Sequence, residues 1–224
     1  MSTRATLYLF RALVMLVAIP FHEAAHAYVS WRLGDSTAKD YGRMTLNPVA
    51  HFDPLGAICM IAVGVGWAKP VPIRASNFRN PKAGMAISAL AGPAANLLLA
   101  YVSTAVYKLL AFFLPAAGVW YWLQLFFYYM VIVNVTLGVF NLLPVPPFDG
   151  SRLALAFLPQ RWYFQIMRYE RYIFLAMFLL LMMGFFDVPL GYLQQAMLTL
   201  MDRGTSFIDW IAAAKAAASA ATAV

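Results

Sequence analysis

Long apolar runs constrain the fold of this chain more than any other feature of its sequence. They cover residues 6–29, 83–114 and 120–143. At about 1.5 Å of rise per helical residue, each run is long enough to cross a hydrocarbon core of about 30 Å. Only 11% of the 224 residues are charged, whereas a soluble domain has about 25%. The sequence therefore predicts an all-α polytopic membrane protein, a bundle of about four to six transmembrane helices.

A shorter apolar segment at residues 53–67 does not fit a full crossing. It is interrupted by Pro54 and by glycines at positions 56, 64 and 66, which weaken a helix. Irregular backbone at membrane depth is tolerated where it is buried in protein or lines a wet cavity. We therefore expect a re-entrant segment here, and a β-hairpin is one form that it could take.

The C-terminal part of the chain leaves two arrangements open. Residues 172–201 are apolar, but a glycine, an aspartate and a proline interrupt them between positions 184 and 189. They form either one kinked span or a short hairpin. We expect a single transmembrane domain at 1–203, with its core at 6–155. The Ala-rich tail at 204–224 is expected to be a short helix or disordered.

The positive charges lie in the connections between the apolar runs. Most lysines and arginines fall at 30–53, 69–82 and 150–171, whereas 115–119 carries none. Cytoplasmic loops of membrane proteins are enriched in Lys and Arg, so the three basic connections are expected in the cytoplasm. The position of these basic residues accounts for the net charge of +7 as a topology signal. We therefore expect no nucleic-acid partner.

The first apolar run contains two histidines and a glutamate, which are costly inside a membrane and usually functional. His22 and His26 are four residues apart, so on a helix they project from one face. This spacing lets two imidazoles hold one metal ion. Glu23 between them points at the open coordination position and can act as a base.

A third ligand has to come from elsewhere in the chain, because a catalytic zinc typically has three protein ligands and one water. The single cysteine, Cys59, excludes a thiolate cluster. Asp149 follows a proline-rich stretch at the end of the third run, where irregular backbone lies near the right depth. We expect His22, His26 and Asp149 to hold one Zn²⁺ per chain. Glu23 is expected to take a proton from the zinc-activated water during peptide hydrolysis.

Three further residues are candidates for supporting roles. Asn96 could hydrogen-bond the substrate backbone or a developing oxyanion, or it could be an amide that packs helices together. Asn141 is a candidate for orienting the loop that carries Asp149. His51 is expected in a loop or behind the ligands more often than as a ligand itself.

Three segments, in this order, resemble the site-2 protease family of intramembrane zinc metalloproteases. They are His-Glu-Ala-Ala-His at 22–26, Gly-Pro-Ala-Ala-Asn at 92–96, and Asn-Leu-Leu-Pro at 141–144 followed by Asp-Gly at 149–150. The resemblance covers about residues 8–155. Within the family, the chain looks like the compact branch, which lacks a PDZ domain.

The resemblance implies the same zinc ligands and the same general base. It also implies cleavage of a transmembrane protein substrate near the cytoplasmic face, as in the regulated release of membrane-tethered factors. The expected location is the cell membrane, with several passes through the lipid bilayer and with the active site toward the cytoplasm.

Two other functions use the same residues. A membrane metal transporter or metal-binding protein would also need a His-His-Asp cluster, but it should carry polar residues across the whole depth of the bilayer. An inactive, protease-like scaffold would have no use for Glu23 or for a complete ligand set. The two histidines, Glu23 and Asp149 are all present, which favours the protease.

Overall fold

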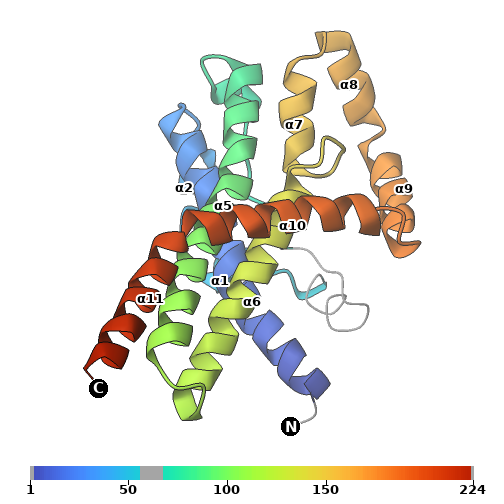
Figure 1. Cartoon of the computed structure of the whole chain (residues 1–224). Coiled ribbons are helices and arrows are strands. Elements are labelled where there is room, and N and C mark those ends of the chain that lie inside the picture. Colours follow the sequence, from blue (N-terminus) through green and yellow to red (C-terminus); the bar gives the residue numbers. More distant parts are fainter. Residues whose placement is uncertain (1–2, 56–67, 223–224) are drawn as a thin grey trace.

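The computed structural model of the chain describes residues 3–55 and 68–222, and every regular element in this part of the chain is a helix (Figure 1). The predicted re-entrant segment falls mainly on residues 56–67, which lie outside the described residues. The helices are α1 (Thr3–Arg32), α2 (Thr37–Asp40), α3 (Pro48–His51), the 3₁₀ helix η1 (Ala75–Asn77), α5 (Pro81–Phe113), α6 (Gly118–Asn141), α7 (Asp149–Ala156), α8 (Gln160–Arg168), α9 (Glu170–Met182), α10 (Asp187–Gly204) and α11 (Ser206–Ala221).

Within the described residues, the three helices α1, α5 and α6 are each long and apolar enough to cross a membrane. They match the three long apolar runs of the sequence to within a few residues. Much of their surface is exposed to the surroundings of the protein, including large apolar side chains such as Leu16 and Leu98, as expected of helices that face lipid. The prediction of an all-α polytopic membrane protein is confirmed.

Helices α9 and α10 form the segment predicted at 172–201, and they fit both predicted forms, a kinked span and a short hairpin. They pass the same length and hydropathy test only as a pair, and their axes are bent by 84°. The turn between them contains Gly184, whose φ of 73° lies in the left-handed region that glycine adopts without strain. If this bent pair counts as one span, the structure has four, the lower limit of the predicted number.

Helix α5 lies between α1 and α6 and contacts both of them. Its buried face is built mainly from small residues, which let neighbouring helices approach closely. A Cβ at Gly138 of α6 would lie 2.9 Å from the side chain of Leu97 in α5. A Cβ at Gly92 of α5 would overlap with the side chains of His22 and His26 in α1, so the small residues around 88–96 also let α1 lie close beside α5.

The C-terminal helices pack on the other side of this bundle. Helix α10 runs across α6 in Figure 1 and contributes Leu190 and Met201 to a core that includes Val135 of α6. Helix α11 lies against α5, where the Lys108 ammonium of α5 is 2.7 Å from the Asp209 carboxylate of α11. The predicted tail at 204–224 thus contains a helix docked on the bundle.

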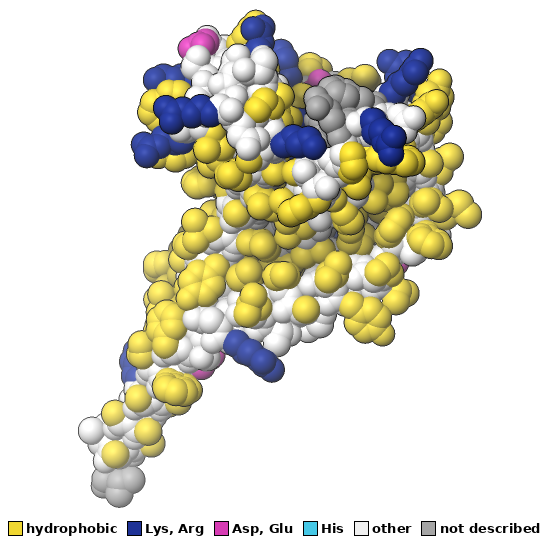
Figure 2. Space-filling model, turned by 90° about the horizontal axis from the view of Figure 1, so that it is seen from above, with side chains coloured by type: hydrophobic (Ala, Val, Ile, Leu, Met, Phe, Trp, Pro, Cys, Tyr) yellow, Lys and Arg dark blue, Asp and Glu magenta, His cyan; other side chains and the backbone are white. Residues whose placement is uncertain are grey.

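Most of the basic side chains gather at one end of the molecule, whereas Lys108, near the far end of α5, and Lys215 of α11 lie elsewhere. Figure 2 shows this end, with lysines and arginines around its rim and apolar side chains over the flank below. It is the end at which α1 finishes and α5 begins, near α2 in Figure 1. The chain therefore has the charge asymmetry by which membrane proteins are oriented.

Candidate metal centre

Two helices far apart in the sequence bring three candidate ligands together. Helix α1 presents His22 and His26, and the first residue of α7 is Asp149. The two Nε2 atoms are 3.0 Å apart, and Asp149 Oδ2 lies 3.1 Å from His22 Nε2 and 3.2 Å from His26 Nε2. The three predicted ligands therefore offer one ligand atom each to a common point.

The opposite nitrogen of each imidazole is held by a hydrogen-bond acceptor. His22 Nδ1–H donates to Asn96 Oδ1 at 2.5 Å, and His26 Nδ1–H donates to the Ser88 carbonyl oxygen at 2.7 Å. A neutral imidazole that carries its proton on Nδ1 has a lone pair on Nε2. Both Nε2 lone pairs are therefore directed toward the shared point.

A chain of amides fixes the orientation of the Asn96 side chain. The Met130 carbonyl oxygen accepts from Asn134 Nδ2, and Asn134 Oδ1 accepts from Asn96 Nδ2 at 3.0 Å. This leaves Asn96 Oδ1 as the acceptor for His22. Both asparagine side chains are fully buried, and sequence reasoning missed Asn134, although an amide inside an apolar run is a signal that could have found it.

The donor set fits a zinc ion. Ligand atoms at about 2.0–2.2 Å from a tetrahedral zinc lie about 3.3 Å from one another, close to the 3.0–3.2 Å separations of the three atoms here. Two imidazole lone pairs and a carboxylate at these distances repel one another unless a cation lies between them. Two histidines and one carboxylate also leave a fourth coordination position for water.

Two glycines make room for this arrangement. A Cβ on Gly92 of α5 would overlap with the His26 Nε2 atom and with the ring of His22. A Cβ on Gly150 would overlap with the backbone carbonyl of Leu142 at the end of α6. The first glycine lets α5 lie against the two imidazoles, and the second lets the start of α7, with Asp149, close onto α6.

The charge of Asp149 is set by its neighbours. Burial by itself raises the pKa of this carboxyl group; in the absence of a cation, protonated imidazoles of His22 and His26 donate from Nε2 to the carboxylate and lower its pKa below the ordinary value. A metal ion at the same point would take the place of these protons and favour the ionised carboxylate in the same way. Asp149 is therefore ionised, which is the form that binds a metal ion.

Glu23 lies in the same cavity as the three ligands, which has a volume of about 670 Å³. Its Oε2 accepts a hydrogen bond of 3.1 Å from the backbone N–H of Val71. Apolar side chains of α9, among them Phe174 and Met177, line another part of the cavity. An apolar cavity with a few convergent polar groups is the usual form of an active site.

The other predicted residues take different positions. Asn141 lines the cavity at the end of α6. His51 is the buried last residue of α3; its Nε2–H donates to the Thr45 carbonyl oxygen, and its own carbonyl oxygen accepts from Lys69 N–H. Asn96 contacts His22 as described above. Whether any of the three takes part in the reaction stays a prediction.

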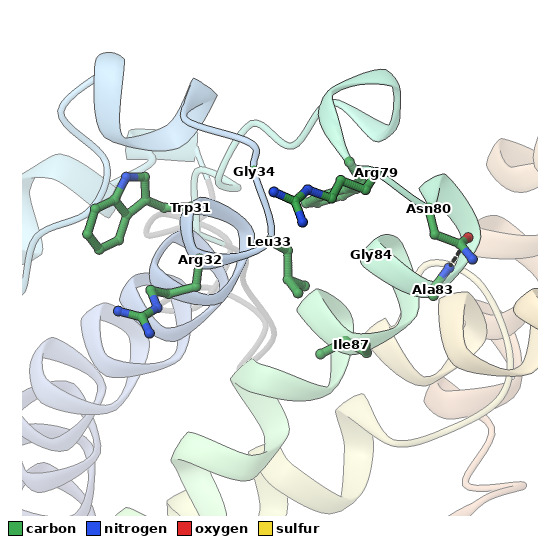
Figure 3. Close-up of a pocket in the computed structure, with 10 residues that line it drawn as sticks. Trp31, Arg32, Leu33, Gly34, Arg79, Asn80, Ala83, Gly84 and Ile87 are labelled. Carbon is green, nitrogen blue, oxygen red and sulfur yellow. Dashed lines mark hydrogen bonds between the residues drawn. The ribbon is translucent and has the colours of Figure 1, made fainter.

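A second cavity of about 380 Å³ lies where α1 ends and α5 begins (Figure 3). It is lined by Trp31–Gly34 and by residues 78–80, 83, 84 and 87. The side chain of Arg79 extends across the view toward Gly34. The residues that line this second cavity include none of the candidate metal ligands.

The sequence is also similar to known proteins whose names describe zinc metalloproteases. The sequence model of "Peptidase family M50" matches residues 114–184. A protein of Bacillus subtilis (strain 168) named "Putative zinc metalloprotease YwhC" is 36% identical over 186 residues, which cover 81% of this chain and 82% of that protein.

A second relative, from Mycolicibacterium smegmatis, is named "Putative zinc metalloprotease Rip2". It is 34% identical over 140 residues, which cover 60% of this chain and 52% of that protein. The chain thus spans most of the length of the first relative and about half that of the second. No solved structure matches.

Proposed function

The chain belongs to peptidase family M50, and from this membership we propose that it is a zinc-dependent intramembrane protease. Its substrate in this proposal is a transmembrane protein, cut at a peptide bond near the cytoplasmic face in a regulated way. The observation that supports it best is the grouping of His22, His26 and Asp149 beside Glu23 in one cavity between apolar helices.

In this mechanism His22, His26 and Asp149 would hold the zinc ion. When bound, the ion lowers the pKa of a coordinated water to about 7 and polarises the substrate carbonyl group. Glu23 takes a proton from the attacking water and passes it to the nitrogen of the leaving amine. Asn96 and the Ser88 carbonyl oxygen keep both imidazoles in the tautomer that binds metal.

The surroundings of the cavity suit a substrate that comes from the bilayer. Its walls are largely apolar, and the α9 residues Phe174, Phe178 and Leu181 form part of them. The peptide bonds of a helical substrate are hydrogen-bonded, so the cleaved segment has to unwind before it enters. The basic end of the molecule faces the cytoplasm in this proposal, because positive loops stay inside.

We also propose that residues 1–203 act as one protease domain with its core at 6–155, and that 204–224 is a C-terminal appendage to it. The partners in this proposal are the substrate and the lipid bilayer, and nucleic acid is not a partner. The docking of α11 on α5 makes the appendage part of the folded bundle.

The proposal is tested with purified protein in proteoliposomes and a single-span reporter peptide that carries a Gly-Pro pair near its cytoplasmic end. We expect wild-type protein to hold about one zinc per chain and to cut the reporter. Glu23→Gln should keep the zinc and lower kcat by about 10²- to 10⁴-fold, the usual contribution of a general base. Asp149→Ala should lose zinc and activity together, whereas Asp40→Ala, which changes an exposed acid that does not line the cavity, should lose neither.

The outcomes separate the other functions. Zinc-dependent passage of metal across the vesicle membrane, with no cleavage by the wild type, would favour a transporter. Bound zinc without cleavage or transport would favour an inactive scaffold. Equal zinc in wild type and Asp149→Ala would remove Asp149 from the ligand set.

A further inference from the structure

The hydrogen bond between Glu23 and Val71 is made by a proline-rich segment. Val71 stands between Pro70 and Pro72, and proline has no backbone N–H. Of these three residues, only Val71 can donate from the backbone, and its N–H is 3.1 Å from Glu23 Oε2.

The local sequence holds this segment in an extended form. Each proline fixes its own φ and pushes the preceding residue toward extended backbone. Lys69 and Val71 both precede a proline. Residues 69–72 are therefore stiff before any tertiary contact is made, and we refer to residues 69–74 as the strut.

Both ends of the strut are tied to the rest of the protein. At its start, Lys69 N–H donates to the His51 carbonyl oxygen at 3.0 Å. At its end, Arg74 N–H donates to Asp35 Oδ2 at 2.7 Å, just beyond the end of α1. Asn77 Nδ2 donates to the other oxygen of the same carboxylate, also at 2.7 Å.

The middle of the strut is fixed by packing. The Val71 side chain is 9% exposed and lies in a small core with Ala27 of α1 and Ala38 of α2. Ile73 and Met44 pack against the same core. Ala27 is one helical turn from Glu23, so the contact that buries the Val71 side chain also brings its N–H to the carboxylate.

We propose that the strut is a positioning element for the general base, acting through the Val71 N–H; the inference rests on the proposed protease function. The bond takes one carboxylate oxygen, Oε2, and so restricts the rotation of the Glu23 side chain. Oε1 is then turned to the cavity, where it accepts the proton of the attacking water. A base that is held in one rotamer, next to the proton it removes, reacts faster than a base that samples several rotamers.

Val71→Pro tests this, because proline removes the N–H and suits an extended position between two other prolines. We expect kcat per bound zinc toward the single-span reporter to fall about 10- to 100-fold, part of the contribution that a general base makes. KM and zinc content should stay near the wild-type values. Val71→Ala keeps the N–H, and we expect it to lower kcat less than about threefold.

Met44→Ala is the matched packing control. It removes apolar contacts from the same small core but lies outside the strut and the cavity. We expect it to lower the melting temperature and to leave kcat per zinc unchanged. A fall in kcat in Met44→Ala as large as in Val71→Pro would show that packing, not the N–H, controls the rate, and would overturn the proposal.

A double-mutant cycle separates positioning from general damage. Glu23→Asp keeps a carboxylate on a side chain too short to reach Val71. If Val71 acts through Glu23, adding Val71→Pro to Glu23→Asp should lower kcat by less than about threefold more. A full additional 10-fold loss would mean that Val71 acts elsewhere.

A second route does not depend on a proline. Asn77→Ala removes a hydrogen bond that holds the Asp35 carboxylate, to which the end of the strut is tied through Arg74 N–H, and should lower kcat per zinc about three- to tenfold at unchanged KM. If Val71→Pro fails to fold, an unchanged kcat in Asn77→Ala overturns the proposal by itself. Where Glu23→Gln abolishes cleavage but Val71→Pro and Asn77→Ala do not impair it, only the positioning role is lost and the protease function stands.

Discussion

Helix α5 contributes to two polar clusters. One is made of neutral groups, and the other is made of charged groups. Toward its start, Ser88 and Asn96 are fully buried and hold the two histidines of α1 with a neutral carbonyl and a neutral amide. Toward its end, Lys108 pairs with Asp202 and Asp209 from the C-terminal helices, and these carboxylates are 68% and 37% exposed.

The difference follows from whether the groups of each cluster are exposed to solvent. A charge without solvent is strongly destabilising, whereas a neutral amide with all its hydrogen bonds made is tolerated in a dry interior. The first cluster therefore orients the two imidazole rings with neutral groups. In this region the charge is confined to the metal site itself. The second uses charge, because its acidic partners lie at the surface. We expect the first cluster to control metal binding and the second to control only the docking of α10 and α11.

The largest expected effect is at Gly92, where the first cluster has no spare room. In Gly92→Ala the new methyl group overlaps with the His26 Nε2 atom and the ring of His22, so α5 and α1 have to separate. We expect bound zinc to fall from about one to nearly none per chain, by elemental analysis, because the ligand atoms no longer meet.

The matched substitution in the other region is Gly191→Ala in α10, where nothing lies within 4 Å of the added carbon. We expect it to keep full zinc and to be more stable by about 0.5–1 kcal/mol, because alanine favours a helix over glycine. Full zinc in Gly92→Ala would contradict the placement of α5 against the two imidazoles.

The parts of this protein that could be predicted from sequence are those specified by local patterns. Apolar runs predicted α1, α5 and α6, and the spacing of His22 and His26 predicted their common face. Asp149 was predicted from the proline-rich stretch before it. In each case the signal lies within a few residues of the feature it specifies.

What could not be predicted depends on pairs far apart in the chain. The Asn96–Asn134 bond joins two spans, and the Glu23–Val71 bond joins a helix to a loop 48 residues away. An ion pair from Lys108 joins α5 to the docked helix α11, but in the sequence Lys108 appears only as a charge inside an apolar run. An asparagine or lysine in such a run signals the need for a partner, but it does not say which residue the partner is.

Asp35 gives an intermediate test, because it is charged like the second cluster but fully buried and bound by neutral donors like the first. Burial raises the pKa of this carboxyl group, and the hydrogen bonds from Thr37, Arg74 and Asn77 outweigh it and lower the pKa below its ordinary value. We expect Asp35→Asn to lose about 1–3 kcal/mol of stability at neutral pH, because an amide cannot accept all of these bonds.

The sign of the pH dependence follows from the lowered pKa. The stability that Asp35 contributes is complete above the pKa of an unfolded aspartate, about 3.9, and is lost as the pH falls through the lower folded pKa. The melting temperatures of wild type and Asp35→Asn in detergent should therefore converge as the pH approaches about 3. Asp40→Asn, at an exposed residue bonded to Ser36, should differ little from wild type at any pH. A gap for Asp35→Asn that stays constant with pH would show that its charge is not involved.

The smallest effect is expected at Lys108. Lys108→Met keeps most of the apolar stem and removes the ammonium group, and the two carboxylates left behind can be solvated because both reach the surface. Lys108 is buried but both of its carboxylate partners reach solvent, so we expect a loss of about 1 kcal/mol, the upper end of the range for exposed ion pairs, and a fall of only a few degrees in melting temperature. Zinc content and reporter cleavage should not change, and in a double-mutant cycle with Asp209→Asn the coupling energy should be below about 1 kcal/mol. Loss of zinc in Lys108→Met would mean that the two clusters act on each other along α5, and that docking of the C-terminal helices sets the position of the histidine contacts.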